Sequence, residues 1–339
     1  MSAQVDSSGP AVSFSFQREE PLGPAIERIR AELFDSILDA LEHLEPNHDQ
    51  NIHDARRQLK KLRGVLRLVR GSIEPAAYER DNACFRDVGR SLAEAREAAA
   101  TLECVEALLA HYDDRIPRRE FSTIERALGA QRAETVARVG ETSTVARAIE
   151  ELRSARGPDR AWTLSGEDFE LIRAGLFATY RGARRACRRA SRTSSSENFH
   201  ELRKLSKYHL HHVRLLEPVF VLELRARRRA LDALNEALGH LHDLDMLRAL
   251  LDREKLESVP LLQRLAFSAL VDQRRREVAL DAELQAARLY AEKPRALAKR
   301  LRSYFELWRA PSPPISEDAP HDGEPAPNTV QPPSRSITA

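Results

Sequence analysis

IHDARRQLKKLRGVLRLVR, residues 52–70, and FHELRKLSKYHLHHVRLL, residues 199–216, repeat one pattern of charged and apolar positions. A shift of 147 residues superposes the two stretches and matches their cations: His53 with His200, Arg56 with Arg203, Arg57 with Lys204, Lys60 with Lys207 and Arg67 with Arg214. At about 100° per residue, the matched positions occupy one side of an α-helix, and leucine, valine and alanine occupy the other. The sequence therefore predicts two amphipathic helices, each with a core side and a cationic side.

A second echo at nearly the same distance indicates an internal duplication. LAEAREAA, residues 92–99, precedes the similar LGHLHDLD, residues 238–245, by 146 residues. The expected order of elements also repeats: helix, basic helix, long helix, helix. Short loops between four helices favour an antiparallel bundle. We therefore expect an all-α protein with two four-helix bundles related by internal duplication and pseudo-twofold symmetry.

Helical periodicity predicts the elements of the first half. We expect a helix over about 24–44, a basic helix that ends near Gly71, one long helix over about 75–111 and another over about 118–140. Residues 141–165 are expected to form a junction with a short helical piece. The run from Ser165 to Asp168 resembles a capping box that opens the next helix.

The second half is expected to contain helices that end near residues 190, 216, 254 and 292, and a last helix over about 294–308 that packs on the second bundle. The helical domain then covers residues 14–309, with halves at 14–142 and 165–309. Composition predicts that residues 1–13 and the Pro-rich residues 310–339 are disordered tails.

Composition excludes several classes of protein. Of the 339 residues, 42% are hydrophobic and 31% charged, with only 13 glycines, which is typical of a mostly helical globular chain. No run of 18 apolar residues predicts a membrane span, and the N-terminus lacks the pattern of a secretion signal. Cys84, Cys104 and Cys187 form no C-x-x-C pair, so we expect core cysteines in a reducing cytoplasm.

The net charge of +2 conceals a strong segregation of charge. Residues 50–70 hold seven Lys/Arg against one acidic residue, and residues 171–230 hold fifteen against four. The rest of the chain is correspondingly acidic, which indicates a basic face on an acidic body. A third stripe lies on the helix before the second basic one, within an arc of about 100°: Arg181, Arg184, Arg185, Arg188 and Arg192. We therefore expect the second half to be the stronger focus of positive potential.

The cationic sides predict an anionic ligand. A Lys/Arg-rich helix is often plain solvated surface, but such helices usually mix Glu with Lys four residues apart. Here the cations have almost no acidic partner on their own helix. Guanidinium and ammonium groups suit phosphate oxygens, and histidine can donate a hydrogen bond beside them. Neither G-x-x-x-x-G-K-[ST] nor G-x-G-x-x-G is present, so an extended polyanion fits better than a single nucleotide.

Other ligands and activities remain as alternatives. Single-strand nucleic-acid binders add aromatic platforms, and here aromatic residues are 6%, with only Tyr208 on the basic helices and off the cationic arc. A phosphate-accepting histidine is another alternative, because phosphotransfer modules are four-helix bundles. No carboxylate or Cys completes a metal site with the histidines near the second basic helix. We find no paired-carboxylate site or nucleophilic triad, so we expect neither catalysis nor a cofactor.

The two basic stretches resemble the signature helices of a known family, the conserved histidine α-helical domain, or CHAD. FQREEPLGPAIERI, residues 16–29, is similar to the family's opening, and LGHLHDLDML, residues 238–247, to the segment after the second signature helix. The resemblance extends over about residues 14–308. It implies two four-helix bundles and a basic face that binds inorganic polyphosphate, with a cytoplasmic location at polyphosphate granules. Some members carry a preceding triphosphatase domain, but only about 13 residues precede this domain, so we expect no such activity.

The resemblance and the cationic pattern together define the expected site. The family's contacts map onto His53, Arg56, Arg57, Lys60 and Arg67, and onto His200, Arg203, Lys204, Lys207 and Arg214. The pattern of cations adds Arg63, Arg96, Arg181, Arg184, Arg185 and Arg188.

The chain departs from the family in three places. Arg96-Glu97 and His242-Asp243 stand where Arg-Asp is usual. Leu210 occupies the position that matches the cation Arg63. The first helix lacks the arginine stripe of residues 181–192.

Overall fold

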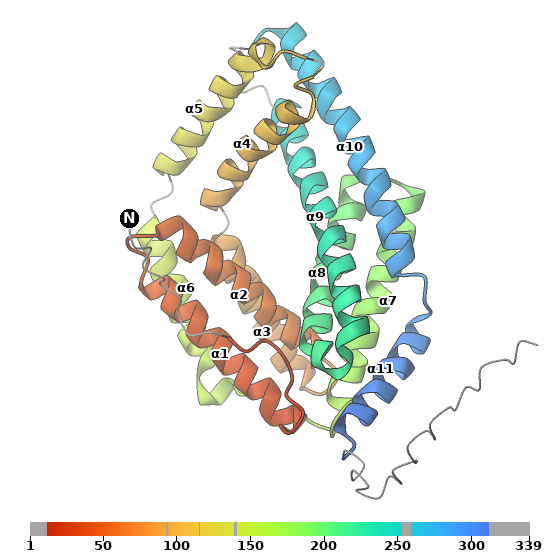
Figure 1. The fold of residues 1–339 in the computed structure, drawn as a ribbon. Coiled ribbons are helices and arrows are strands. Elements are labelled where there is room, and N and C mark those ends of the chain that lie inside the picture. Colours follow the sequence, from red (N-terminus) through yellow and green to blue (C-terminus); the bar gives the residue numbers. More distant parts are fainter. Residues whose placement is uncertain (1–11, 93, 115, 139–140, 253–258, 312–339) are drawn as a thin grey trace, which may run out of the picture. The chain divides into compact units, whose positions relative to one another are not determined.

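The computed structural model describes residues 12–92, 94–114, 116–138, 141–252 and 259–311, and the side chains of these residues except those of 94–100, 131–138, 141 and 142. Within these ranges the protein is all-α, as predicted, with eleven α-helices and no β-strand (Figure 1). The helices belong to one compact unit that ends at Arg309. The predicted tails lie almost wholly outside the described residues. No helix in the described ranges is long and apolar enough to cross a membrane.

The first half contains six α-helices and two short 3-10 helices. In chain order they are α1 (Leu22–Glu42), α2 (His48–Leu68), α3 (Pro75–Ser91), α4 (Glu94–His111), η1 (Arg118–Phe121), α5 (Ser122–Arg138), α6 (Glu141–Arg156) and η2 (Pro158–Arg160). The apolar stripe of α1 explains its place, because Ile26, Ile29, Leu33 and Ile37 are fully buried.

Two predictions for this half were wrong. The single long helix expected over 75–111 is two helices, α3 and α4, because α4 packs against α5 and α9. The expected junction holds the 16-residue helix α6, which packs against α1 and α3. The periodicity of each segment was real, but the partner on which each segment packs decides where one helix ends and the next begins.

The described part of the second half contains five α-helices and a short 3-10 helix: α7 (Glu170–Arg192), α8 (Ser196–Leu216), η3 (Glu217–Phe220), α9 (Val221–Asp252), α10 (Leu261–Leu289) and α11 (Pro294–Arg309). Helix α8 packs against α7, α9 and α2, and α11 packs against α7 and η3. The last helix thus joins the second half, as predicted.

The capping box predicted at residues 165–168 is absent from the start of α7. The Ser165 hydroxyl instead donates to the Ser72 carbonyl, and the Ser165 backbone N–H donates to the same oxygen at 2.8 Å. Asp168 has a φ of 43°, in the left-handed region, so the chain turns before α7 starts at Glu170. This turn ties the second half to the loop after α2.

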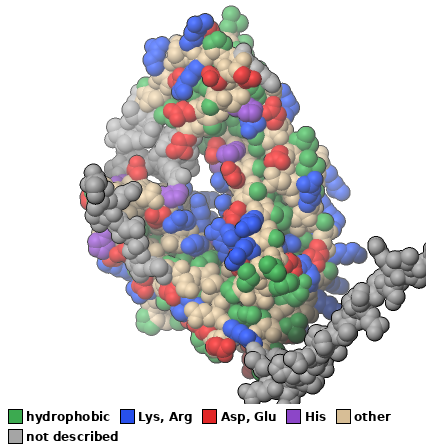
Figure 2. Space-filling view, viewed as in Figure 1, with side chains coloured by type: hydrophobic (Ala, Val, Ile, Leu, Met, Phe, Trp, Pro, Cys, Tyr) green, Lys and Arg blue, Asp and Glu red, His purple; other side chains and the backbone are tan. Residues whose placement is uncertain are grey.

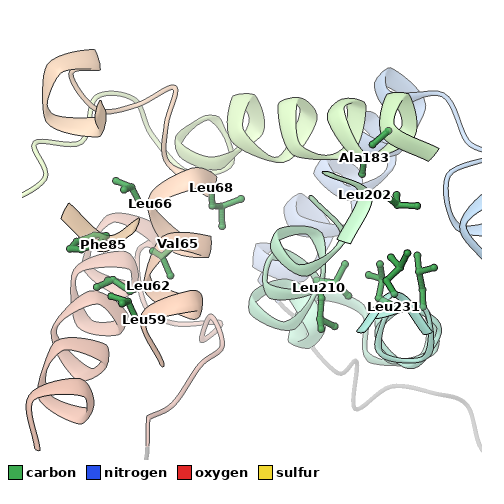
Figure 3. Packing of buried hydrophobic residues seen from close by; sticks show 14 of the residues in the cluster. Leu59, Leu62, Val65, Leu66, Leu68, Phe85, Ala183, Leu202, Leu210 and Leu231 are labelled. Atoms are coloured by element: carbon green, nitrogen blue, oxygen red, sulfur yellow. The ribbon is translucent and has the colours of Figure 1, made fainter. Parts of the chain in front are cut away.

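Buried side chains of both halves form one hydrophobic cluster. Figure 3 shows Leu59, Leu62 and Phe85 among the packed residues of the first half, and Leu202 and Leu231 among those of the second. Full burial of one such leucine or phenylalanine contributes about 1.5–3 kcal/mol. The core positions alternate with the cations along the helices, so packing the core sets the direction in which the cations point.

Glycine allows the two halves to approach closely. A Cβ on Gly64 of α2 would lie only 2.9 Å from the Cβ of His211 on α8. A Cβ on Gly175 of α7 would clash with the backbone carbonyls at the end of α2. His212 Nε2 donates to the Gly64 carbonyl at 3.0 Å, a buried hydrogen bond between the halves. The two basic helices are therefore locked against each other.

Candidate functional site

Four cations from the two basic helices converge, and we call them the cationic quartet: Arg56 and Lys60 from α2, and Arg203 and Lys207 from α8. Helix α2 packs against α8, so the cationic sides predicted separately for each helix form one patch. Figure 2 shows Lys and Arg side chains gathered near the middle of the view, in the region of α2 and α8.

Crowding in the quartet changes its proton affinities. Desolvation, followed by the charges of Arg56, Arg203 and Lys207, lowers the pKa of Lys60 to about 8, although its side chain is exposed. Desolvation and then the charges of Arg203 and Arg214 lower the pKa of Lys207. A bound anion would relieve this repulsion and favour the protonated lysines.

A second basic pair, Lys61 and Arg214, lies beside the quartet. Desolvation, then Arg57 and Arg214, lowers the pKa of Lys61 to about 8. The Lys61 Nζ lies 5.2 Å from the centre of the Phe14 ring. Arg214 donates to Asp232 at 2.9 Å. Both cations line a surface pocket of about 460 Å³.

A third group consists of Arg63 and Arg67 on the ring of Tyr208. The guanidinium carbons lie 5.8 Å and 4.3 Å from the ring centre. Tyr208 is only 5% exposed, so the two guanidinium groups lie over a buried ring and make cation–π contacts with it. The shift of 147 residues matches Tyr208 with Lys61, and Arg214 with Arg67.

These equivalent contacts support the predicted duplication. Gly64 and His211 are also counterparts under the shift, and they touch each other where α2 meets α8. Lys60 and Lys207 are counterparts too, and each other's neighbours. Contacts between equivalent positions are expected where a pseudo-twofold axis passes between two copies.

Four further predicted residues lie on α2 and α8: His53, Arg57, His200 and Lys204. Arg57 pairs with Asp54 at 3.0 Å, and Lys204 pairs with Glu201. His53 is half-buried, whereas His200 is exposed, with its ring centre 5.5 Å from that of His242. The side chain of Arg96, in α4, lies outside the described residues.

The arginines of the α7 stripe lie at different angles from the contact with α8. Helix α7 faces α8 through Gly182, where a Cβ would lie 3.3 Å from the side chain of Leu205. On α7, Arg184 and Arg188 lie about 160° and 120° around the helix from Gly182, whereas Arg181 and Arg185 lie about 100° and 60° from it. Arg184 Nε donates to the Tyr290 carbonyl at 2.9 Å, after the end of α10.

On α8, the quartet residues lie on the side of the helix that is opposite its contact with α7. Arg203 and Lys207 each lie about 160° around α8 from Leu205, the residue that packs on α7. The quartet therefore points away from α7. We therefore leave Arg181, Arg184, Arg185 and Arg188 out of the proposed site; that they strengthen the second half stays a prediction.

Comparison with known proteins identifies the family of this chain. Residues 29–252, more than half of the chain and most of the helical unit, match the CHAD domain family. The chain belongs to the CHAD domain family. None of the curated proteins matches it.

Two solved structures share the CHAD fold of this chain. PptA from Streptomyces chartreusis is 15% identical with a TM-score of 0.55, and the match covers 79% of this chain and 100% of that one. The CHAD domain from the plant Ricinus communis is 18% identical with a TM-score of 0.50, covering 90% of this chain and 99% of that one. At these identities the likeness concerns the fold alone.

Sequence reasoning missed three contributors to this CHAD site. Lys61 lies about 100° around α2 from Lys60 and is not among the predicted residues. Tyr208 was considered only as a platform for bases, whereas it seats Arg63 and Arg67. Phe14 precedes the first helix and reaches Lys61 only through tertiary packing. The doublet of adjacent lysines was the one signal that could have identified Lys61.

Three histidines, His209, His211 and His212, are buried on the inner side of α8 in this CHAD domain. His209 lies 3.3 Å from the Tyr290 hydroxyl, and His212 donates to Gly64. Burial lowers the pKa of His212 to about 4, and lowers the pKa values of His209 and His211 well below the usual value. All three are therefore neutral at pH 7. In the described part of the chain, no group of three or more His, Cys, Asp or Glu could hold a metal ion.

Proposed function

We propose that this CHAD domain binds inorganic polyphosphate on the surface formed by α2 and α8, without catalysis. The observation that carries the proposal is the cationic quartet, in which desolvation and then the like charges of the two helices lower the pKa of Lys60 to about 8. Such repulsion costs stability in the free protein and is relieved by a polyanion. The group on Tyr208 and the pair of Lys61 and Arg214 extend the cationic surface.

Several features favour phosphates over bases. Tyr208 is buried beneath Arg63 and Arg67, so it offers no free face on which a base could stack. Guanidinium groups bind phosphate oxygens in pairs, and lysines act as compact point charges. Nucleic acid remains the second candidate ligand, because its backbone presents the same phosphate chemistry.

A competition experiment tests the ligand. Labelled polyphosphate is bound to the protein and displaced with unlabelled polyphosphate or with single-stranded RNA of equal total charge, at fixed salt. We expect polyphosphate to be the better competitor, by at least about tenfold, because stacking contributes about 1–3 kcal/mol per base to RNA only where aromatic platforms exist. Equal or better competition by RNA would move the proposal to a nucleic-acid or general polyanion binder.

A second experiment tests the absence of catalysis and the alternative of a phosphohistidine. The protein is incubated with polyphosphate and Mg²⁺, and orthophosphate release and acid-labile phosphate on the protein are measured. We expect neither. Turnover that disappears in His53→Ala or His200→Ala would establish phosphotransfer instead.

The proposal also predicts a place in the cell. A fluorescent fusion should colocalise with polyphosphate granules in the cytoplasm of a polyphosphate-accumulating cell, and a fusion without the quartet cations should not.

A further inference from the structure

A surface pocket lies at the C-terminal end of α8. Its volume is about 460 Å³, and its cations are Lys61 of α2, Arg214 of α8, and Arg225 and Arg228 near the start of α9. Arg214 lies within about 20° of Lys207 around α8 and about 10.5 Å, or two turns, further along the helix axis. The cationic side that α8 contributes to the quartet therefore continues into this pocket.

The cations of the pocket differ in what contacts them. Lys61 Nζ lies 5.2 Å from the centre of the Phe14 ring, and Lys61 pairs with no carboxylate in the part of the chain that the structure describes. Arg214, in contrast, donates to Asp232 at 2.9 Å. An aromatic ring leaves the charge of a cation available to a ligand, whereas a carboxylate partly neutralises it. Lys61 therefore presents its full charge to the pocket.

The segment before α1 and the turn after α8 form a wall of the pocket. Phe14 and Ser15 line it, and so does Glu217, the first residue of η3. The Phe16 backbone N–H donates to the Leu215 carbonyl at 3.0 Å. This hydrogen bond fixes the segment against the end of α8, so the wall is a built part of the fold.

Two carboxylates accompany the arginines of the pocket. Glu217 accepts hydrogen bonds from Arg225 at 3.2 Å and from Arg228 at 2.6 Å. Asp232 accepts from Arg214 at 2.9 Å and from Arg228 at 3.3 Å. Four cations against two carboxylates leave two positive charges. A terminal phosphate carries about two negative charges at neutral pH, whereas an internal phosphate of a chain carries one.

We propose that this pocket is a subsite for a terminal phosphate group, which Lys61 and Arg214 contact. A terminal phosphate does not continue on its far side, so it can end against the wall of the pocket. A chain that continued past Arg214 would meet the carboxylates of Glu217 and Asp232, which repel it. Phe14 is the positioning residue that holds Lys61 at the pocket.

The equivalent position in the first half lacks this lysine. The shift of 147 residues matches Lys61 with Tyr208, and the Tyr208 ring lies 4.3 Å from the guanidinium carbon of Arg67, the counterpart of Arg214. A buried ring therefore stands where the ammonium group would be. The two ends of the surface differ, and we expect the terminal phosphate at the end that holds Lys61.

Two kinds of ligand present a terminal phosphate: the end of a polyphosphate chain, and a phosphomonoester such as a nucleotide. Pro218 and Val221 give the pocket apolar surface, which a nucleotide base can contact. AMP is therefore the probe for the second source. The chain end as the source rests on the proposed function, whereas the phosphate subsite itself does not.

The experiment compares short polyphosphate chains that have free ends with the same chains capped at both ends as methylamine phosphoramidates. Capping gives each terminal group the charge of an internal phosphate. Isothermal titration of the full chain at pH 7 measures both affinities. We expect free-ended chains to bind about tenfold more tightly, because capping removes charge-assisted hydrogen bonds to the terminal oxygens. In Lys61→Gln the two kinds of chain should bind alike.

Three variants separate the pocket from the general charge of the surface. Lys207→Gln removes the same charge from the quartet and should weaken both kinds of chain by one factor, so that the preference for free ends remains. Lys299→Gln, at an exposed lysine of α11, should change neither affinity. Glu217→Gln removes a carboxylate that faces a continuing chain, so it should strengthen the binding of capped chains. This gain of binding tests the subsite even if Lys61→Gln does not fold, as judged by circular dichroism.

Equal affinity of the parent protein for free-ended and capped chains would overturn the subsite and leave the proposed function standing. A preference that persists in Lys61→Gln would do the same. AMP that lowers the preference of the parent for free ends would support a subsite open to phosphomonoesters, and an unaltered preference would assign the subsite to chain ends. If neither kind of chain binds, the proposed function fails and AMP decides the subsite. AMP binding that is lost in Lys61→Gln would support it, and no binding of AMP would overturn it.

Discussion

Helices α2 and α8 share a cationic side but differ on the side that faces the core. The quartet takes matched residues from both, Arg56 with Arg203 and Lys60 with Lys207. On the inner side, α8 has His209, His211 and His212 where α2 has Leu62, Gly64 and Val65. The two helices thus share their outward charges and differ where they pack. The reason is that α2 fits its small Gly64 against the larger His211 of its counterpart.

The two helices also differ in the residue that contacts the matched arginines, Arg67 and Arg214. Arg67 of α2 lies over Tyr208, whereas its counterpart Arg214 donates to Asp232 and faces Lys61. An aromatic ring leaves the charge of an arginine available, and a carboxylate partly neutralises it. Matched positions therefore do not carry equal effective charge, and α2 contributes more free positive charge than the plain alignment indicates.

The buried histidines of α8 predict that the free energy of unfolding falls at acid pH. Burial holds the pKa of His212 near 4, against about 6.5 in the unfolded chain. Below pH 6.5 the unfolded chain binds a proton that the folded chain does not, so stability falls as pH falls toward 4. At pH 5 this loss is about 2 kcal/mol for His212 alone. His209 and His211 act in the same direction, because burial lowers their pKa values too.

Urea unfolding at pH 7.5 and pH 5 measures this effect. His212→Gln should reduce the difference between the two free energies of unfolding by about 2 kcal/mol. His200→Gln, at an exposed histidine on the same helix, is the control and should not reduce it. An unchanged difference in His212→Gln would mean that burial does not keep His212 neutral.

Loss of the outward charges of both helices should nearly abolish binding. Arg56→Ala/Lys60→Ala/Arg203→Ala/Lys207→Ala should weaken polyphosphate binding about 100-fold, or about 2.7 kcal/mol. By analogy with nucleic acids, each cation removed should flatten the logarithmic salt slope by up to about one unit. Helicity by circular dichroism should persist, since these side chains lie opposite the core positions. Binding with unchanged affinity and salt slope would show that the quartet is merely solvated surface.

Separate neutralisation of each helix tests whether the quartet acts as one site. Arg56→Ala/Lys60→Ala and Arg203→Ala/Lys207→Ala should each weaken binding about tenfold, because each removes half of a shared cluster.

The matched control for these doubles is Arg185→Ala/Arg188→Ala on α7, which removes the same charge from two exposed arginines. Isothermal titration at fixed ionic strength should detect little loss in it. A loss as large as that of the quartet doubles would return the α7 stripe to the binding surface.

The smallest expected effect is the pH dependence of polyphosphate binding, which the lysines of α2 should influence more than Lys204 of α8. The pKa values of Lys60 and Lys61 on α2 are about 8, and polyphosphate binds best to protonated lysines. As pH rises from 7 to 8, each lysine should weaken binding by about twofold, because the free protein loses charge that binding must restore. Lys60→Arg/Lys61→Arg should bind with less pH dependence over this range than the parent, and Lys207, whose pKa is also lowered, accounts for what remains. Lys204→Arg on α8 should keep the pH dependence of the parent.

The sequence was sufficient for the features that depend on a single helix. Apolar periodicity located most helices, and the shift of 147 residues located both cationic sides, because each side is set by the angle between residues on one helix. The same local pattern led to the CHAD family, which the match over residues 29–252 confirms. The break between α3 and α4 was missed, since both segments carry helical periodicity and only their different partners separate them.

Features that depend on two helices were decided by the tertiary structure. Periodicity does not contain the rotation of one helix relative to another, so it could not exclude the α7 stripe or include Lys61. Close packing at Gly64, Gly175 and Gly182 sets those rotations. Electrostatic interaction depends on distance and on exposure to water. Desolvation in the folded protein is the main cause of the lowered pKa of Lys60, and Arg203 and Lys207 add to it once α8 packs on α2.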